Sequence, residues 1–312
     1  HGADIDARSD WSMGPFGVLH IARGELARYL VERGATVDAC GAARMGDLDA
    51  LGRLIAAAPW RVHERGGDGK APLHFAADVS TAAWLLDHGA DLHLRCTDHH
   101  STPVMYAAED RHDVVRYLLE RGAAPDVFLA VCLDDAAMLS ILLDEQSQRV
   151  HARLNEGELI TPPGIWLMYA WICKVAGGDR PPTVLHAAAA MGRTQLARLL
   201  IERGADVNAR GGYDDATPLH FAAWHGCTET AMALLDAGCA ACSPSGNAHR
   251  QPPLGWAIVN GRVDTVRALL DASVPVLDHY LDEARAGLRG EFDFARGSAD
   301  EYRQIIDMLE GR

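Results

Sequence analysis

Two short sequence patterns alternate along the chain and constrain its fold more than any other feature. The first ends an apolar run with Gly-Ala or a close variant, as in HGADIDAR at 1–8, ERGATVDA at 32–39, HGADLHLR at 88–95 and ERGADVNA at 202–209. The second opens the next run, as in GKAPLHFAA at 69–77, HSTPVMYAA at 100–108 and ATPLHFAAWHG at 216–226. Between the two patterns, apolar residues recur at helical spacing. The sequence therefore predicts tandem pairs of helices.

These patterns resemble the ankyrin repeat over roughly residues 1–273. Proline in the first helical turn and glycine after the second helix suit the start and the end of such helices. Each pair has an apolar face that it cannot bury alone, so neighbouring pairs stack. The resemblance implies an all-α ankyrin-repeat solenoid of about eight helix-turn-helix repeats. Residues 274–312 are expected to form a helical C-terminal cap, with Ser298 or Asp300 as an N-cap. Because the chain opens on the end of a repeat, we also expect further sequence upstream.

A longer block of the sequence is itself duplicated. Residues 61–65 recur as residues 149–153, at an offset of 88 residues. The block holds nearly three repeats, and its middle members, about 37–58 and 125–146, lack the Thr-Pro-Leu-His opening. We expect these two members to have shortened finger loops.

The second copy departs from the first by an insertion of 24 residues between His151 and Thr183. The insertion, about 154–181, is too apolar to be disordered and holds an aromatic run at 165–172. We predict an extended finger folded over the groove of the solenoid, and a structural plug that shields the neighbouring short finger is the alternative. A group of bacterial ankyrin-repeat proteins carries a similar aromatic insertion, a resemblance that implies no activity. The candidate contact residues of this finger are Glu156, Trp166, Tyr169 and Trp171.

The net charge of −14 excludes some partners. An acidic chain lacks the basic face that nucleic acids and anionic membranes require, and the sequence holds no run near the ~20 apolar residues of a membrane span. The chain has seven cysteines, and an odd number in a chain of this length does not match the disulfide framework of a small secreted protein. We therefore expect free thiols and a cytoplasmic protein. A metal or redox role for the single CxxC pair, Cys239 and Cys242, is the alternative.

Several of the many histidines are explained by a structural role, without any catalytic or metal-binding role. His20, His74, His186 and His220 occupy the histidine position of the Thr-Pro-Leu-His opening. In ankyrin repeats this imidazole bonds the backbone of adjoining loops, so the resemblance implies the same role here.

Acidic and imidazole side chains also alternate at the expected finger tips, which is what a metal or general-base site needs. Adjacent repeats stack about 8–10 Å apart, so only neighbours can share an ion. Solvated turn residues are the simpler alternative, and the chain has no GxSxG, P-loop or HExxH motif. Two candidate sets follow from this spacing: Asp214, Asp215 and His249, and Asp98, His99 and His100 with Glu156.

The variable positions of the first helices are expected to face the concave side of the solenoid. Tyr106, Trp224, His225 and Trp256 are the candidate anchors there, and burial against the neighbouring repeat is the alternative. Our first hypothesis is a protein-binding scaffold without a cofactor, whose partner is basic or amphipathic. The second is a small-molecule hydrolase, in which the inserted finger roofs a pocket and finger-tip residues hold a water or a divalent metal such as zinc.

Overall fold

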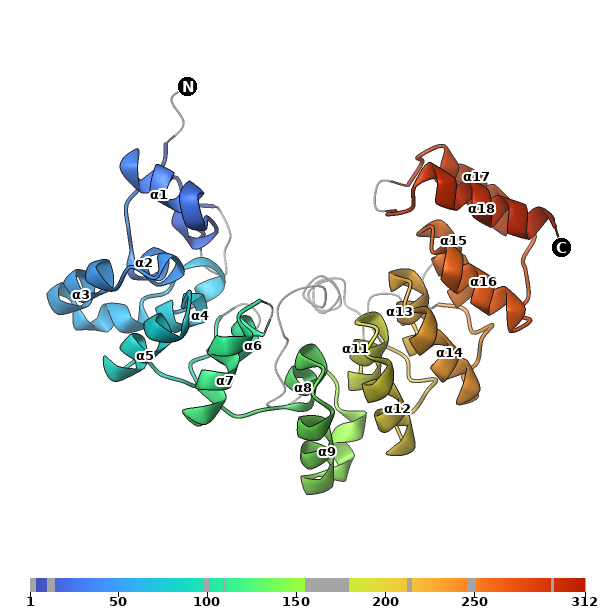
Figure 1. The fold of residues 1–312 in the computed structure, drawn as a ribbon, viewed down its shortest axis with the longest axis horizontal. Coiled ribbons are helices and arrows are strands. Elements are labelled where there is room, and N and C mark those ends of the chain that lie inside the picture. Colours follow the sequence, from blue (N-terminus) through green and yellow to red (C-terminus); the bar gives the residue numbers. More distant parts are fainter. Residues whose placement is uncertain are drawn as a thin grey trace. The chain divides into compact units, whose positions relative to one another are not determined.

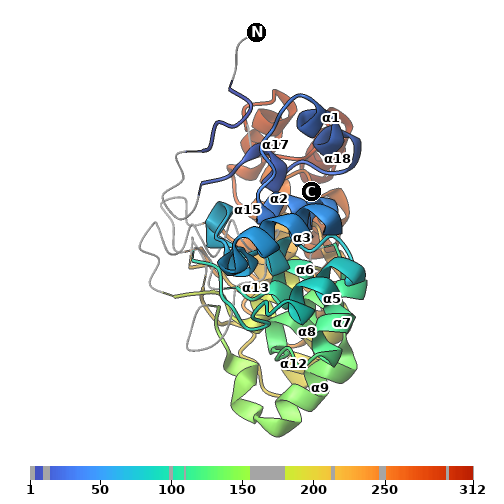
Figure 2. The ribbon, with the colours of Figure 1, turned by 90° about the vertical axis from the view of Figure 1, so that its left-hand side faces the viewer.

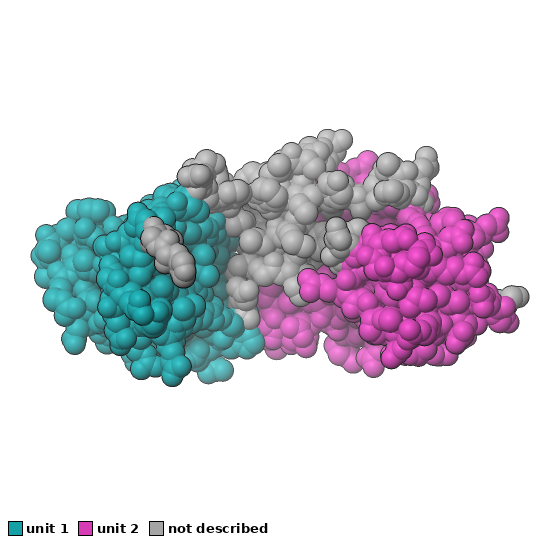
Figure 3. Space-filling view, turned by 90° about the horizontal axis from the view of Figure 1, so that it is seen from above, with its two compact units in different colours: residues 1–125, 160–167 teal, residues 126–159, 168–312 magenta. Residues whose placement is uncertain are grey.

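The computed structural model describes residues 4–9, 15–97, 101–108, 110–154, 180–211, 215–245, 251–292 and 295–311. The chain divides into two compact units, one of residues 1–125 with 160–167 and one of residues 126–159 with 168–312 (Figure 3). Regular structure in the described ranges is helical, apart from two isolated antiparallel bridges, Arg153 with Thr183 and Gly211 with Ala216. The predicted all-α class is thus confirmed.

The first unit consists of short helices in pairs (Figure 1). The first member of each pair packs on the first member of the next, so that η1, α2, α4 and α6 form one row. Among the second members, α5 packs on α7, and Figures 1 and 2 show α3, α5 and α7 following one another along one side. The elements are η1 Val18–His20, α1 Gly24–Glu32, α2 Ala39–Met45, α3 Leu48–Ala57, η2 Pro59–His63, η3 Gly67–Gly69, α4 Pro72–Phe75, α5 Val79–Asp87, α6 Pro103–Ala107 and α7 His112–Glu120.

The second unit continues the same pattern within itself. Its first helices form the row α8, α11, α13, α15 and α17, and its second helices form the row α9, α12, α14, α16 and α18. Each row buries small and branched apolar side chains between neighbouring helices, which is the stacking that isolated helix pairs need. The elements are α8 Val127–Leu133, α9 Ala136–Glu145, η4 Ser147–His151, α11 Val184–Ala190, α12 Thr194–Glu202, α13 Pro218–His225, α14 Thr228–Asp236, α15 Pro253–Val259, α16 Val263–Asp271, α17 Tyr280–Leu288 and α18 Ala299–Glu310.

The duplication seen in the sequence is reproduced element by element. The helices α7, α8, α9 and η4 each begin and end 88 residues after α1, α2, α3 and η2. In both short-fingered repeats an aspartate replaces the opening loop, and Asp38 and Asp126 cap the following helix through the N–H groups of Gly41 and Leu129. The helix can start at once because the carboxylate accepts a backbone N–H of the first turn, which has no partner within the helix.

Buried histidines join consecutive repeats. The Nδ1 atom of His186 accepts the N–H of Thr183 at 3.1 Å, and its Nε2–H donates to the carbonyl of Ala216 in the next repeat at 3.0 Å. His74 and His220 make the same two bonds in their own repeats. The prediction that these imidazoles bond the backbone of adjoining loops is confirmed for all three.

His20 differs because a short-fingered repeat follows it. Its Nδ1 accepts the N–H groups of Gly17 and Gly67, each at 3.2 Å. Its Nε2–H meets the carboxylate of Asp38 at 2.8 Å, in place of a finger carbonyl, and Arg8 reaches the same carboxylate at 3.0 Å. The missing finger thus leaves a charged acceptor where other repeats have a neutral one.

Three arginines link neighbouring fingers. Arg153 donates to the carbonyls of Pro181 in its own finger and of Arg210 in the next, at 2.6 and 2.9 Å. Arg65 and Arg210 make the same two-finger link in their repeats. A guanidinium suits this role because its planar fork presents several donors at once.

The last helix pair ends the second unit's stack. α18 begins after Ser298, whose hydroxyl accepts the N–H of Glu301, so the N-cap expected there is present. Tyr280 and Tyr302 are fully buried, and the Tyr302 hydroxyl donates to the carbonyl of Val259 at 2.6 Å. These contacts tie α17 and α18 to the preceding pair.

Candidate functional site

An aromatic cluster lies at the first helices of the second unit. Trp224, at the end of α13, meets the ring of Trp256 on α15 edge to face, with centroids 5.6 Å apart. His220 and Phe221 pack on the same indole at 5.1 and 6.4 Å. Trp256 is 8% exposed, whereas Trp224 is only partly buried. The cluster therefore presents one indole, Trp224, supported from behind by a buried one.

The backbone beneath Trp224 is held in place by the next repeat. Its carbonyl accepts Asn260 Nδ2 at 2.7 Å and Arg262 Nε at 3.0 Å. Gly226 ends α13 with a left-handed φ of 77°, a conformation that glycine adopts without steric penalty. These bonds satisfy a carbonyl in the last turn of the helix and hold the backbone that carries the indole.

His225 stands beside Trp224 and is also partly buried. Burial, aided by the positive charge of Arg262, lowers the pKa of His225 to about 4. The imidazole is consequently neutral at physiological pH. The pair Trp224–His225 thus forms an uncharged, partly exposed patch at the end of α13.

Two other predicted anchors are not on the surface. Tyr106 on α6 is 6% exposed, and Trp256 is buried in the cluster described above. This corrects the expectation that both rings face a partner, and the alternative interpretation, burial against the neighbouring repeat, describes them. Each ring is buried because it packs on the histidine of the preceding repeat, His74 for Tyr106 and His220 for Trp256.

Tyr106 also forms one wall of a cage around a lysine, which the sequence patterns did not indicate. The ammonium of Lys70 lies over the rings of Phe16, Phe75 and Tyr106, at 5.2, 5.3 and 4.5 Å from their centroids. It also pairs with Asp68 at 3.0 Å. Cation–π attraction strengthens when the cation is desolvated, as here. The feature of the sequence that could have drawn attention to Lys70 is the rarity of lysine, since the chain has only two, Lys70 and Lys174.

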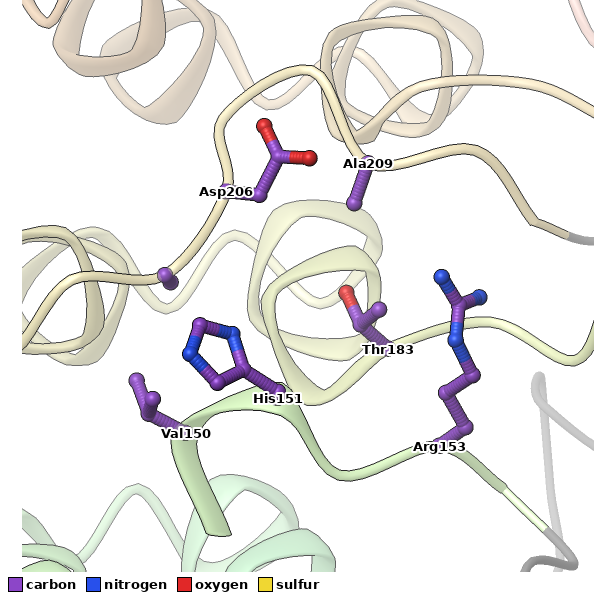
Figure 4. A pocket seen from close by; sticks show the side chains of 7 residues that line it. Val150, His151, Arg153, Thr183, Asp206 and Ala209 are labelled. Carbon is purple, nitrogen blue, oxygen red and sulfur yellow. The ribbon is translucent and has the colours of Figure 1, made fainter. Parts of the chain in front are cut away.

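A small pocket of about 150 Å³ lies where η4 meets the loop after α12 (Figure 4). His151, at the end of η4, and Asp206, in the loop after α12, line the pocket from opposite sides. Arg153 and Thr183 form another wall. In the first copy of the duplicated block, His63 instead accepts the N–H of Asp91 at 3.1 Å. The pocket is smaller than the ~300 Å³ typical of small-molecule sites, so it suits at most a small polar group.

Most of the predicted finger and finger-tip residues lie outside the described residues. Of the two finger-tip sets, only Asp215 lies within the described residues. Its backbone carbonyl accepts a hydrogen bond from the Arg210 guanidinium at 2.9 Å. Within the described ranges, no three His, Cys, Asp or Glu side chains come close enough to hold a metal ion. The residues outside those ranges are Asp98, His99, His100, Asp214, His249, Glu156, Trp166, Tyr169 and Trp171.

The two cysteines of the CxxC pair lie in different environments. Burial raises the pKa of the Cys239 thiol to about 11, which is the opposite of the shift that a reactive cysteine needs. Cys242 is exposed, and both are free thiols.

A family comparison agrees with this architecture. The model described as "Ankyrin repeats (3 copies)" matches residues 39–129, 166–245 and 185–278, which is more than half of the chain. The chain belongs to the ankyrin-repeat family, as the sequence patterns predicted.

Two individual relatives are similar over parts of the chain. Alpha-latrocrustotoxin-Lt1a of Latrodectus tredecimguttatus is 27% identical over 142 residues, which cover 43% of this chain and 8% of that protein. The crystal structure of the human ASB11 ankyrin repeat domain is 26% identical, covers 78% of this chain and 100% of that chain, and has a TM-score of 0.48. In the described ranges, no helix is both long and apolar enough to cross a bilayer.

Proposed function

We propose that this chain is a protein-interaction scaffold that holds its partner at the end of α13, on Trp224 and His225. The observation that carries the proposal is the pair of indoles, in which the buried Trp256 supports the partly exposed Trp224. Rigid, supported tryptophans dominate the binding energy of many protein interfaces. Asn260 and Arg262 fix the backbone of Trp224, so little ordering remains to oppose binding.

The chemistry of the partner follows from charge. The chain carries −14, and its contact pair is uncharged, because the pKa of His225 lies near 4. A basic or amphipathic segment would be attracted by the net negative charge of the chain and would place an apolar side chain against Trp224. We propose the inserted segment, about 154–181, as a second contributor to this interface.

The test is a matched pair of tryptophan substitutions. Trp224→Ala should weaken binding of a cross-linked and identified partner by about tenfold or more, because a tenfold loss corresponds to ~1.4 kcal/mol and interface tryptophans commonly exceed that. Trp60→Ala is the control, since Trp60 is 63% exposed on η2. Equal binding by wild type, Trp224→Ala and a chain lacking 155–178 would contradict the proposal.

The hydrolase hypothesis and its zinc site stay predictions, because the residues that would form them lie outside the described residues apart from Asp215. A cytoplasmic location is likewise our proposal. It is supported by the six described cysteines, all of which are free thiols.

A further inference from the structure

The helix α1 exposes apolar side chains that stacked helices normally bury. Leu26 is 58% exposed, and Ile21, Tyr29 and Val31 are exposed beside it. The flank of the helix next to Leu26 is packed, since Ala27 is fully buried in a core with Leu19, Ala22 and Ala35. α1 is therefore correctly packed on one side and uncovered on the other.

The chain contains its own control for this helix. Residues 26–35 read LARYLVERGA and residues 196–205 read LARLLIERGA, with differences at two positions. Ala27 and Ala197 are both fully buried, so the two helices have the same rotation. Yet Leu196 is 1% exposed, compared with 58% for Leu26. The two leucines differ in exposure because of the neighbouring helix: α9 packs on α12, the helix that carries Leu196.

The duplicated block gives a second comparison. α7 stands 88 residues after α1, and its Val114, at the position of Leu26, is fully buried. Here α5 packs on α7. Both covering helices present apolar side chains at helical spacing, Ala82 and Leu85 on α5 and Leu139 and Leu142 on α9.

From these comparisons we infer that the surface formed by Leu26 and Tyr29 of α1, together with Ile21 just before the helix, is an interaction surface for one further ankyrin-type helix pair. The occupant's second helix packs on α1 as α5 packs on α7. It carries apolar side chains three or four positions apart, like Ala82 and Leu85, and no charge between them. This surface continues the stacking interface of the chain and is separate from the binding surface at Trp224.

A graft supplies the occupant directly. A copy of residues 66–87, which holds α4 and α5, is fused before residue 1 of the full chain. It then runs into His-Gly-Ala-Asp at 1–4, as residues 66–87 naturally run into the same four residues at 88–91. Hydrogen exchange of the α1 amides should slow about tenfold or more, toward the rates of α12, and the urea midpoint should rise. Leu26→Glu in the grafted chain should abolish both effects, as should glutamates at the graft's copies of Ala82 and Leu85.

Two results would overturn the inference. One is a grafted chain whose α1 amides exchange as fast as before. The other is a self-associating ungrafted chain that Leu26→Glu converts to a monomer, because the occupant would then be a second copy. A comparison without the graft is also decisive. Leu196→Glu should lower the urea midpoint strongly and Leu26→Glu hardly at all, whereas equal losses would mean that α1 is already covered.

Discussion

At the scale of single residues, buried polar side chains connect the repeats. The imidazoles of His74, His186 and His220 each span two repeats through backbone bonds. Burial lowers their pKa values to about 3, 4 and 3. They therefore stay neutral in the folded chain at pH values where an exposed histidine is charged.

This difference predicts acid sensitivity. Below the ordinary pKa of about 6.5, the unfolded chain binds protons that the folded chain does not, so stability present at pH 7 is lost as the pH falls toward 4. Between pH 7 and 5 we expect a loss on the order of 1 kcal/mol or more for each such histidine. Urea unfolding at both pH values would measure it. His186→Gln should be less stable at pH 7 but lose less on acidification, and an unchanged pH dependence would contradict the prediction.

The finger arginines predict a second residue-scale effect. Arg210 donates to the carbonyls of Asp215 and Pro244 and to the hydroxyl of Ser243. Arg210→Ala should lower the free energy of unfolding by about 2–3 kcal/mol, since hydrogen bonds from charged groups are the stronger ones. Thermal or urea unfolding checks this, with Arg198→Ala, on the exposed face of α12, as the control. Equal losses in the two variants would show that the finger link contributes nothing.

At the scale of elements, caps determine where the short helices begin. Asp47 and Asp135 occupy the same position 88 residues apart, and each accepts the N–H three residues later, from Ala50 and Met138. Helices of ten residues depend on such caps because few internal bonds stabilise them.

We expect Asp135→Ala to destabilise the chain by about 1 kcal/mol, the usual value for a lost N-cap. Asp135→Asn should retain most of the stability, because the amide oxygen can accept the same bond. Urea midpoints of the three proteins measure the effect. If the asparagine variant is as unstable as the alanine variant, the carboxylate acts through its charge and not as a cap.

At the scale of the whole molecule, the net charge of −14 should affect the rate of association with a partner. For a basic partner, raising the salt from about 50 to 500 mM should slow association by about tenfold or more and change dissociation little, because steering acts at long range and is screened. Stopped-flow or surface measurements of both rates would test this. An association rate that does not depend on salt would exclude a basic partner and leave an apolar one.

Much of the fold was predictable from the sequence because its causes are local. Prolines, caps and glycines set the helix ends, and the duplication at 88 residues set the order of the elements. The candidate site was less predictable. Trp256 holds the position of Phe75, Tyr106 and Phe221 in their repeats, and all four rings are buried, whereas Trp224 lies three places further along its helix and is partly exposed. Only the structure shows that the shared position faces the neighbouring repeat. The cage around Lys70 joins Phe16, Phe75 and Tyr106 from three repeats, a contact that no sequence spacing encodes.

The sequence by itself determined that helix pairs form and that they stack, since periodicity and capping act within a few residues. The tertiary structure alone decided which apolar side chains are core and which are surface. Leu26 and Leu196 show the distinction most directly, because the same leucine in two nearly identical ten-residue segments is exposed in α1 and buried in α12. Burial depends on the neighbour that a helix meets, and the helix's own sequence does not specify that neighbour.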